Sequence, residues 1–128
     1  MTTWSETDVH RRQIERFIQA EAIQVALLRP QFVETTAGGK VAIADLVLPL
    51  QRFRRTPFKR RLVNDWGLSV QGEEVKHADW VLHGKHNADV QVDDYFDDRD
   101  HRYTVIWVND HNLYRTAAGL KVRGRLDP

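Results

Sequence analysis

The spacing of apolar and polar positions changes once along the chain, and the change separates an N-terminal helix from a β-rich remainder. From Ser5 to Ala22, apolar side chains recur at the spacing of one helix face: Val9, Ile14, Phe17 and Ile18. Ser5 carries a hydroxyl that can accept an amide hydrogen of the first turn. The pattern predicts an N-terminal arm and helix over residues 1–22 and β structure over residues 23–128.

After the helix, apolar and polar residues alternate in short runs, which is typical of half-buried strands. The runs Ile23–Leu27 and Val41–Leu48 flank the turn sequence Thr35–Lys40, in which two adjacent glycines permit a positive φ. We expect these runs to form a long hairpin, with the Arg-Pro pair at residues 29–30 ending the first strand.

The C-terminal half predicts further strands at His77–His83, Arg102–Val108 and Leu113–Ala118, and a last short apolar pair after Gly119. Arg102–Val108 is apolar at odd and even positions alike, so we expect it to be buried on both faces. About six or seven short strands after one helix predict a mainly β fold, a small β-barrel or sandwich with extended loops or arms. A length of 128 residues fits a single domain over residues 1–128.

Composition narrows the classes of protein that fit this fold. With 19 basic and 18 acidic residues the formal charge is +1, which argues against a chain that is basic overall and wraps duplex DNA. No cysteine is present, so the chain can form neither a disulfide nor a thiolate metal site. The N-terminus lacks the features of a signal peptide, and no apolar stretch approaches the roughly 20 residues that cross a bilayer. We expect a protein made in a cytoplasm, with no membrane partner.

Candidate catalytic and metal-binding residues are present, but their spacing does not indicate a site. The potential metal ligands of the C-terminal half are His77, Asp79, His83, His86, Asp89 and Asp93. They match no established ligand spacing, and solvated polar residues on the outer face of a sheet explain them equally well.

Groups for covalent or acid–base catalysis are also poorly placed. Of the two serines, Ser5 serves as a helix cap and Ser69 lies in no nucleophile elbow. Asp93 and Asp94 are adjacent, so in an extended chain they point to opposite sides. We therefore expect no catalytic residues, no metal and no cofactor, and interpret the chain as a protein that is not an enzyme.

A basic run is the one feature of the sequence with a plausible ligand. Its cations are Arg52, Arg54, Arg55, Lys59, Arg60 and Arg61, interleaved with Phe53 and Phe58, and we expect them on a basic loop at residues 51–76. They could follow a phosphate backbone, contact carboxylates of a partner subunit, or keep an exposed edge strand from pairing. Trp4, before the helix, is a candidate arm anchor for another subunit.

A family resemblance rests on several short motifs between Ile23 and Val122. Residues 80–90, Asp93-Asp94-Tyr95-Phe96 and Arg102-Tyr103-Thr104-Val105 resemble the head-to-tail connector proteins of long-tailed bacteriophages, with Asp93 where that group usually has glycine. Residues 38–39 and 48–54 are similar to the first hairpin of the family and the arm that follows it.

The resemblance implies a head-closure, or stopper, protein of the phage neck. Such a protein forms a homo-oligomeric ring, here expected to have six copies with twelve as the alternative, below the portal and adaptor proteins. It retains the packaged genomic DNA, which it could contact, and docks the tail terminator or tail tube, so its location is the virion. Two alternatives remain open: a tail terminator or other head–tail joining protein, and a nucleic-acid-binding barrel of the OB type.

Overall fold

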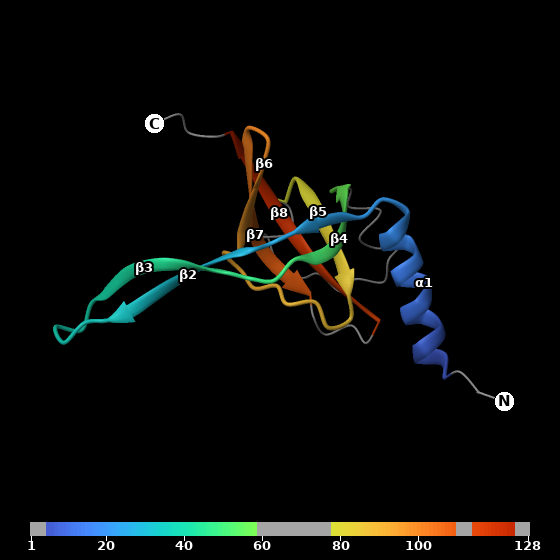
Figure 1. Ribbon diagram of the computed structural model, residues 1–128, viewed down its shortest axis with the longest axis horizontal. Coiled ribbons are helices and arrows are strands. Elements are labelled where there is room, and N and C mark those ends of the chain that lie inside the picture. Colours follow the sequence, from blue (N-terminus) through green and yellow to red (C-terminus); the bar gives the residue numbers. More distant parts are fainter. Residues whose placement is uncertain (1–4, 59–77, 110–113, 125–128) are drawn as a thin grey trace.

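The protein is a mainly β half-barrel with one N-terminal helix and a long projecting hairpin (Figure 1). A computed structural model describes residues 5–58, 78–109 and 114–124. Its elements are α1 (Glu6–Ala20), β1 (Ile23–Val25), β2 (Leu28–Glu34), β3 (Lys40–Val47), β4 (Gln51–Pro57), β5 (Trp80–Lys85), β6 (Tyr95–Asp98), β7 (His101–Asn109) and β8 (Arg115–Gly124). The predicted fold class is confirmed, with eight strands in the described residues rather than six or seven.

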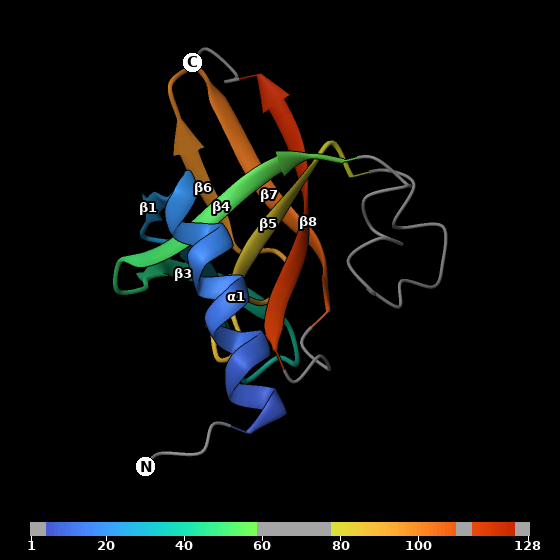
Figure 2. The same ribbon diagram turned by 90° about the vertical axis from the view of Figure 1, so that its right-hand side faces the viewer.

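All paired strands are antiparallel and form one curled sheet in the order β1-β4-β5-β8-β7-β6-β2-β3. Only Ala26 and Leu27 separate β1 from β2, although these strands lie near opposite ends of the sheet order. The curl therefore brings the two ends of the sheet close together, and the segment that contains β1 and β2 contributes a strand near each end. Helix α1 lies against the outside of β4 and β5 (Figure 2).

The helix forms as its sequence predicts. The Ser5 hydroxyl accepts a hydrogen bond from the amide of Asp8 at 3.1 Å, so the cap supplies a partner for a donor that the first turn leaves free. Ile18 is buried against the sheet, and the rest of the helix is exposed or half-buried. Most of its stabilisation therefore comes from one narrow apolar face.

The main core lies inside the curl of the sheet. Its most completely buried side chains are Leu27, Phe53, Leu82, Val105 and Leu120, each at most 1% exposed. A second, smaller cluster combines Ala78, Val81, Trp107 and Ala117. Trp107 is buried in this smaller cluster, and Trp80 packs against the main core.

The hairpin is formed by β2 and β3, and its first strand differs from the prediction. Residues 23–25 of the predicted first strand form β1, which pairs with β4, so the partner of β3 is the following strand, β2. The Arg-Pro pair at residues 29–30 does not end a strand, since β2 continues through Pro30 to Glu34. The pairing of β2 with β3 shifts register between Arg29 and Gln31. Pro30 has no amide hydrogen to donate, and a bulge is a place where a ladder tolerates that loss. In the predicted turn, Gly38 has φ 85°, as expected for one of the two glycines.

Strand β7 packs apolar side chains on both of its faces, as predicted: Tyr103 and Val105 lie in the main core, and Trp107 lies in the smaller cluster because the pairing with β8 shifts register between Val105 and Trp107. Two other expectations need correction. Gly119 does not interrupt the last strand, since β8 runs through it. The segment 51–76 does not start as a loop, because residues 51–57 form β4 between β1 and β5. For the same reason, β4 is not the exposed edge strand that would explain its arginines.

Candidate functional site: a projecting hairpin arm and a basic strand

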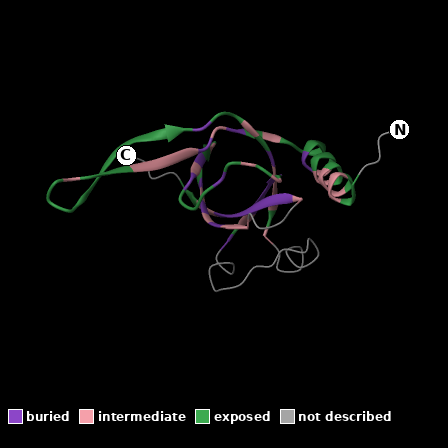
Figure 3. Ribbon diagram, turned by 90° about the horizontal axis from the view of Figure 1, so that it is seen from below, coloured by how far each residue is buried: buried purple, intermediate pink, exposed green. Residues whose placement is uncertain are grey.

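The outer part of the β2–β3 hairpin, residues 31–43, stands away from the half-barrel, and we call it the arm (Figure 3). Its exposed large apolar side chains are Phe32 at 60%, Val33 at 49%, Val41 at 53% and Ile43 at 45%. The register pairs Phe32 with Ala42 and Val33 with Val41, so successive pairs point to opposite faces. Both faces of the arm are therefore apolar, whereas a hairpin lying on its own core shows one apolar face.

A buried ion pair fixes the root of this arm to the barrel. The Arg29 guanidinium donates two hydrogen bonds to the Asp94 carboxylate, each 2.9 Å, and a third to Asp89, also 2.9 Å. Asp94 is fully buried and also accepts the amide hydrogen of Gln91 at 2.8 Å. The hydrogen bond with Asp94 raises the pKa of Arg29, so the guanidinium stays charged. The fork-like geometry ties β2 to the segment before β6.

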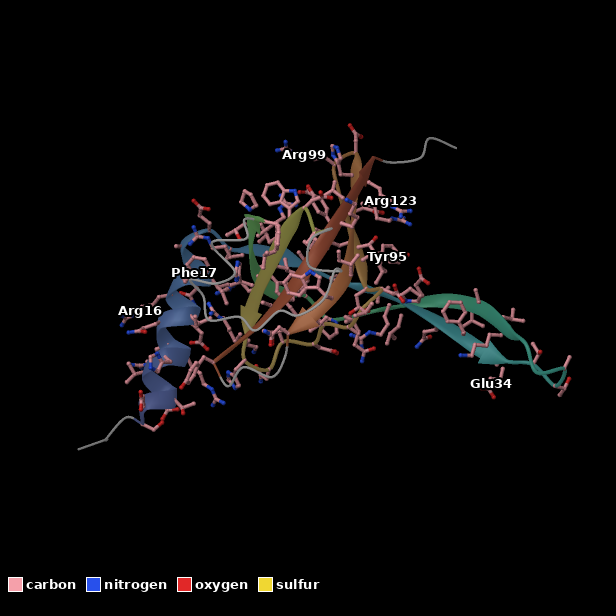
Figure 4. All side chains as sticks on the ribbon, turned by 180° about the vertical axis from the view of Figure 1, so that it is seen from behind. Arg16, Phe17, Glu34, Tyr95, Arg99 and Arg123 are labelled. Carbon is pink, nitrogen blue, oxygen red and sulfur yellow. The ribbon has the colours of Figure 1, made fainter. Side chains whose placement is uncertain are left out.

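A second contact joins the other strand of the arm to the barrel. The Tyr95 hydroxyl on β6 donates a hydrogen bond to the carboxylate of Asp45 on β3, and this bond raises the pKa of Tyr95. Figure 4 shows Tyr95 at the root of the arm and Glu34 towards its tip. Both strands of the arm are thus anchored at the root, while the apolar part beyond them has no cover within the described chain.

Sequence reasoning missed Arg29 as an anchoring residue. It treated residues 29–30 as the end of a strand, and Asp89 and Asp94 as unpromising carboxylates. Arg29 and Asp94 are 65 positions apart, and only the antiparallel contact of β2 with β6 brings them together. The available signal was an arginine within an apolar run, which needs an acidic partner once it is buried.

The basic run divides at β4, because its residues alternate between the two sides of the strand. Arg54 points outwards to α1, where its guanidinium donates a hydrogen bond to the carbonyl oxygen of Phe17 at 3.0 Å. The guanidinium carbon also lies 4.1 Å from the centre of the Phe17 ring. Arg54 also pairs with Glu21 at 3.5 Å. The last turn of α1 contains no basic residue, so Arg54 supplies the positive charge that favours a helix C-terminus.

The neighbouring positions of β4 face inwards. Arg55 is 3.3 Å from Asp98 and lies over the rings of Tyr103 and Trp80, and Phe53 is 1% exposed in the core. Arg54 and Arg55 thus hold the fold together, and of the candidate cations in the described chain Arg52 is the exposed one. Lys59, Arg60, Arg61 and the candidate anchor Trp4 lie outside the described residues, as does His77.

The former metal candidates are scattered rather than gathered. His83 is buried and its Nε2 is 2.9 Å from the Thr56 hydroxyl. Asp79 accepts the amide hydrogen of Val122 and pairs with Lys121, while Asp89 pairs with Arg29. In the parts of the chain that the structure describes, no group of three or more potential ligands could hold a metal ion.

His83 gives the fold a specific response to acid. Burial lowers its pKa from 6.5 to about 4, and the charges of Arg115 and Arg54 add to the effect. The unfolded chain therefore binds a proton at a higher pH than the folded one, so stability present above pH 6.5 is lost as the pH falls towards 4. We expect a loss of up to about 3 kcal/mol from this residue, measured by urea unfolding across that range.

The variant His83→Gln should remove this part of the pH dependence, whatever it does to stability at neutral pH. His101→Gln changes an exposed histidine and is the matched control. An unchanged acid response in His83→Gln would show that another group is responsible.

A groove lies where α1, β1 and the β3–β4 connection meet, and it has a volume of about 600 Å³. Ile18, Ala88 and Pro49 give it an apolar lining, and Leu50, which is 66% exposed, lies at its edge. The charged residues that line it are Glu15, Arg52, Lys85 and Asp89. At one side of the groove, the Gln51 side chain makes two hydrogen bonds with the backbone of Asp89, 3.0 and 2.8 Å long.

Comparisons with known proteins add no relative. No protein-family model matches the chain, and searches of curated proteins and of solved structures find no significant match. Within the described ranges, the helix is too short and too polar to span a bilayer.

Proposed function

We propose that the protein is a structural joining protein of a bacteriophage neck, a head-closure or stopper ring that retains packaged DNA and docks the tail. The observation that carries the proposal is the arm: a small half-barrel anchors, through a buried ion pair, a hairpin whose two apolar faces are exposed. Monomeric proteins rarely expose such surface unless it serves an interaction. An anchored arm on a small barrel is suited to linking subunits into an assembly.

The backbone at Asp93 supports the motif resemblance behind this proposal. Asp93 has φ 77°, in the left-handed region that glycine adopts without a steric cost, and it occupies the position where the connector family usually has glycine. Its amide donates to the carbonyl oxygen of Val105 at 2.9 Å, and the amide of Val105 donates to the carbonyl oxygen of Asp94 at 2.8 Å. The turn that precedes β6 thus has the backbone conformation that a glycine at this position would favour.

A pair of substitutions at this position tests that reading. Asp93→Gly should be as stable as the natural chain within about 0.5 kcal/mol, because relief of the left-handed conformation offsets the greater freedom of the unfolded glycine. Asp93→Val should lose about 1–2 kcal/mol, because a β-branched residue is strained there. Chemical denaturation of the two variants measures both values. Equal stability of the glycine and valine variants would contradict the assigned conformation.

The OB-type alternative finds less support in the described residues. Binding of single strands needs aromatic side chains that are open to stack on bases. Phe53 is buried in the core, and Phe58 packs against the smaller cluster. Arg54 and Arg55 are already engaged within the fold. The aromatic residues that were expected to interleave with the cations are therefore not presented as a stacking surface.

Binding and size measurements on the purified protein distinguish the two functions. The joining protein should bind a fluorescent oligonucleotide of single-stranded DNA only weakly, even at low salt. It should also form rings, alone or on a portal complex, and light scattering and electron microscopy detect them. A monomer that binds the oligonucleotide tightly at low salt, with an affinity that falls steeply as salt rises, would contradict the joining function.

A further inference from the structure

We propose that the arm of one copy docks into the groove between α1 and the β3–β4 connection of the next copy. This inference rests on the proposed ring assembly and names the surfaces that would join its subunits. It begins from the arm, where Phe32 faces one way and Val33, Val41 and Ile43 face the other. Since both faces are apolar, the arm presents apolar side chains to a partner on either side.

The arm points away from the groove, although the groove extends to Asp89, which pairs with Arg29 at the root of the arm. The arm projects away from α1, and α1 contributes part of the groove (Figures 1 and 2). One copy therefore cannot fill its own groove without detaching the anchored root of the arm. Two different surfaces that complement each other on separate copies produce head-to-tail contacts, which close into a ring or extend into a filament.

The chemistry of the two surfaces is complementary. The arm has apolar side chains flanked near its tip by an opposite-charge pair, Glu34 and Lys40, which face each other across the strands. The groove has an apolar lining and charged residues of both signs: Arg52 and Lys85 can pair with a carboxylate, and Glu15 can pair with an ammonium group. Its volume holds a few side chains of the arm rather than the whole hairpin.

Other occupants fit the arm less well. Lys40 is the only cation between residues 31 and 43, so the arm does not suit a phosphate backbone. A second copy of the chain, in contrast, carries a groove whose apolar and charged residues match those of the arm, and every copy carries both surfaces. The arm is also held in place before assembly, by Arg29 and by Tyr95, which reduces the entropy lost on docking.

Cysteine cross-linking tests this contact, because the natural chain contains no cysteine. Thr36→Cys places a thiol at the tip of the arm, Gln19→Cys places one in the groove, and Asp100→Cys places one on the exposed β6–β7 turn. A bismaleimide added to mixtures of single variants should link Thr36→Cys to Gln19→Cys at least fivefold more than to Asp100→Cys. Equal linkage to both partners, or linkage mainly between two Thr36→Cys copies, would overturn the docking.

Complementation supplies a second readout. Val41→Asp with Ile43→Asp disables the arm, and Leu50→Asp disables the edge of the groove; both changes are at exposed positions, so the fold should persist. The arm variant carrying Gln19→Cys should cross-link fully to the Leu50→Asp variant carrying Thr36→Cys, because this mixture joins an intact arm to an intact groove. The reverse mixture, with Thr36→Cys on the disabled arm and Gln19→Cys in the disabled groove, should cross-link far less. If both mixtures behave alike, the docking is wrong, although particles lacking the protein could still show the neck defect of the proposed function.

Discussion

Replacing Arg29 with methionine should destabilise the fold by about 3–5 kcal/mol. The substitution keeps most of the apolar stem but leaves the carboxylate of Asp94 buried without its cation, and an uncompensated buried charge costs about this much. Urea denaturation at neutral pH measures the loss. Because Arg29 also fixes the root of the arm, the variant should lose arm-dependent assembly under conditions where it is still folded.

The pair Arg102–Asp97 is a matched control for this effect. Arg102 also makes two hydrogen bonds to one carboxylate, 2.8 and 3.2 Å long, but it is 51% exposed whereas Arg29 is 17% exposed. Arg102→Met should therefore lose no more than about 1 kcal/mol. Similar losses for the two variants would mean that burial of Asp94 does not govern the contribution of Arg29.

Replacing Gly119 with alanine should destabilise the fold by about 3 kcal/mol. A Cβ atom at this position would lie 2.1 Å from the Trp107 indole nitrogen and 2.2 Å from a neighbouring ring carbon. Trp107 is buried in the smaller core cluster, so the ring cannot move aside without disturbing Ala117 and Val81. The expected cost is at the upper end of the range for overpacked cores.

Two further variants separate the clash from the general effect of a glycine substitution. Gly124→Ala lies on the same strand with nothing within 4 Å of its Cβ, so it should change stability by less than about 0.5 kcal/mol. The double variant Gly119→Ala with Trp107→Val should be more stable than the sum of the single changes predicts, since the smaller side chain leaves room. Strict additivity would contradict the proposed contact.

The parts of the fold that the sequence predicts correctly depend on residues that are close together along the chain. The cap at Ser5, the apolar face of α1 and the glycine turn of the hairpin are local features, and each was anticipated. Passage of β2 through Pro30 was not, because the bulge that tolerates it forms only when β3 is alongside. Placement of Trp107 in the smaller cluster depends on the register shift between β7 and β8, which the sequence of β7 alone does not contain.

The candidate site shows the same division. Six cations in a short run indicated a charged surface, yet β4 sends Arg54 to the helix and Arg55 into the barrel. The arm was expected as a hairpin, but its exposure on both faces follows from where the barrel ends. Arg29 was missed because its partner is remote in sequence.

Electron microscopy of phage particles that lack this protein tests the neck function most directly. The mutation would be an early stop codon in the phage that encodes the chain, and the control is the same phage supplied with the protein from a plasmid. We expect DNA-filled heads that lose their genome and fail to join otherwise normal tails, with both defects repaired by the plasmid. Stable, full heads accompanied by tails of abnormal length would contradict head closure and indicate a tail terminator instead.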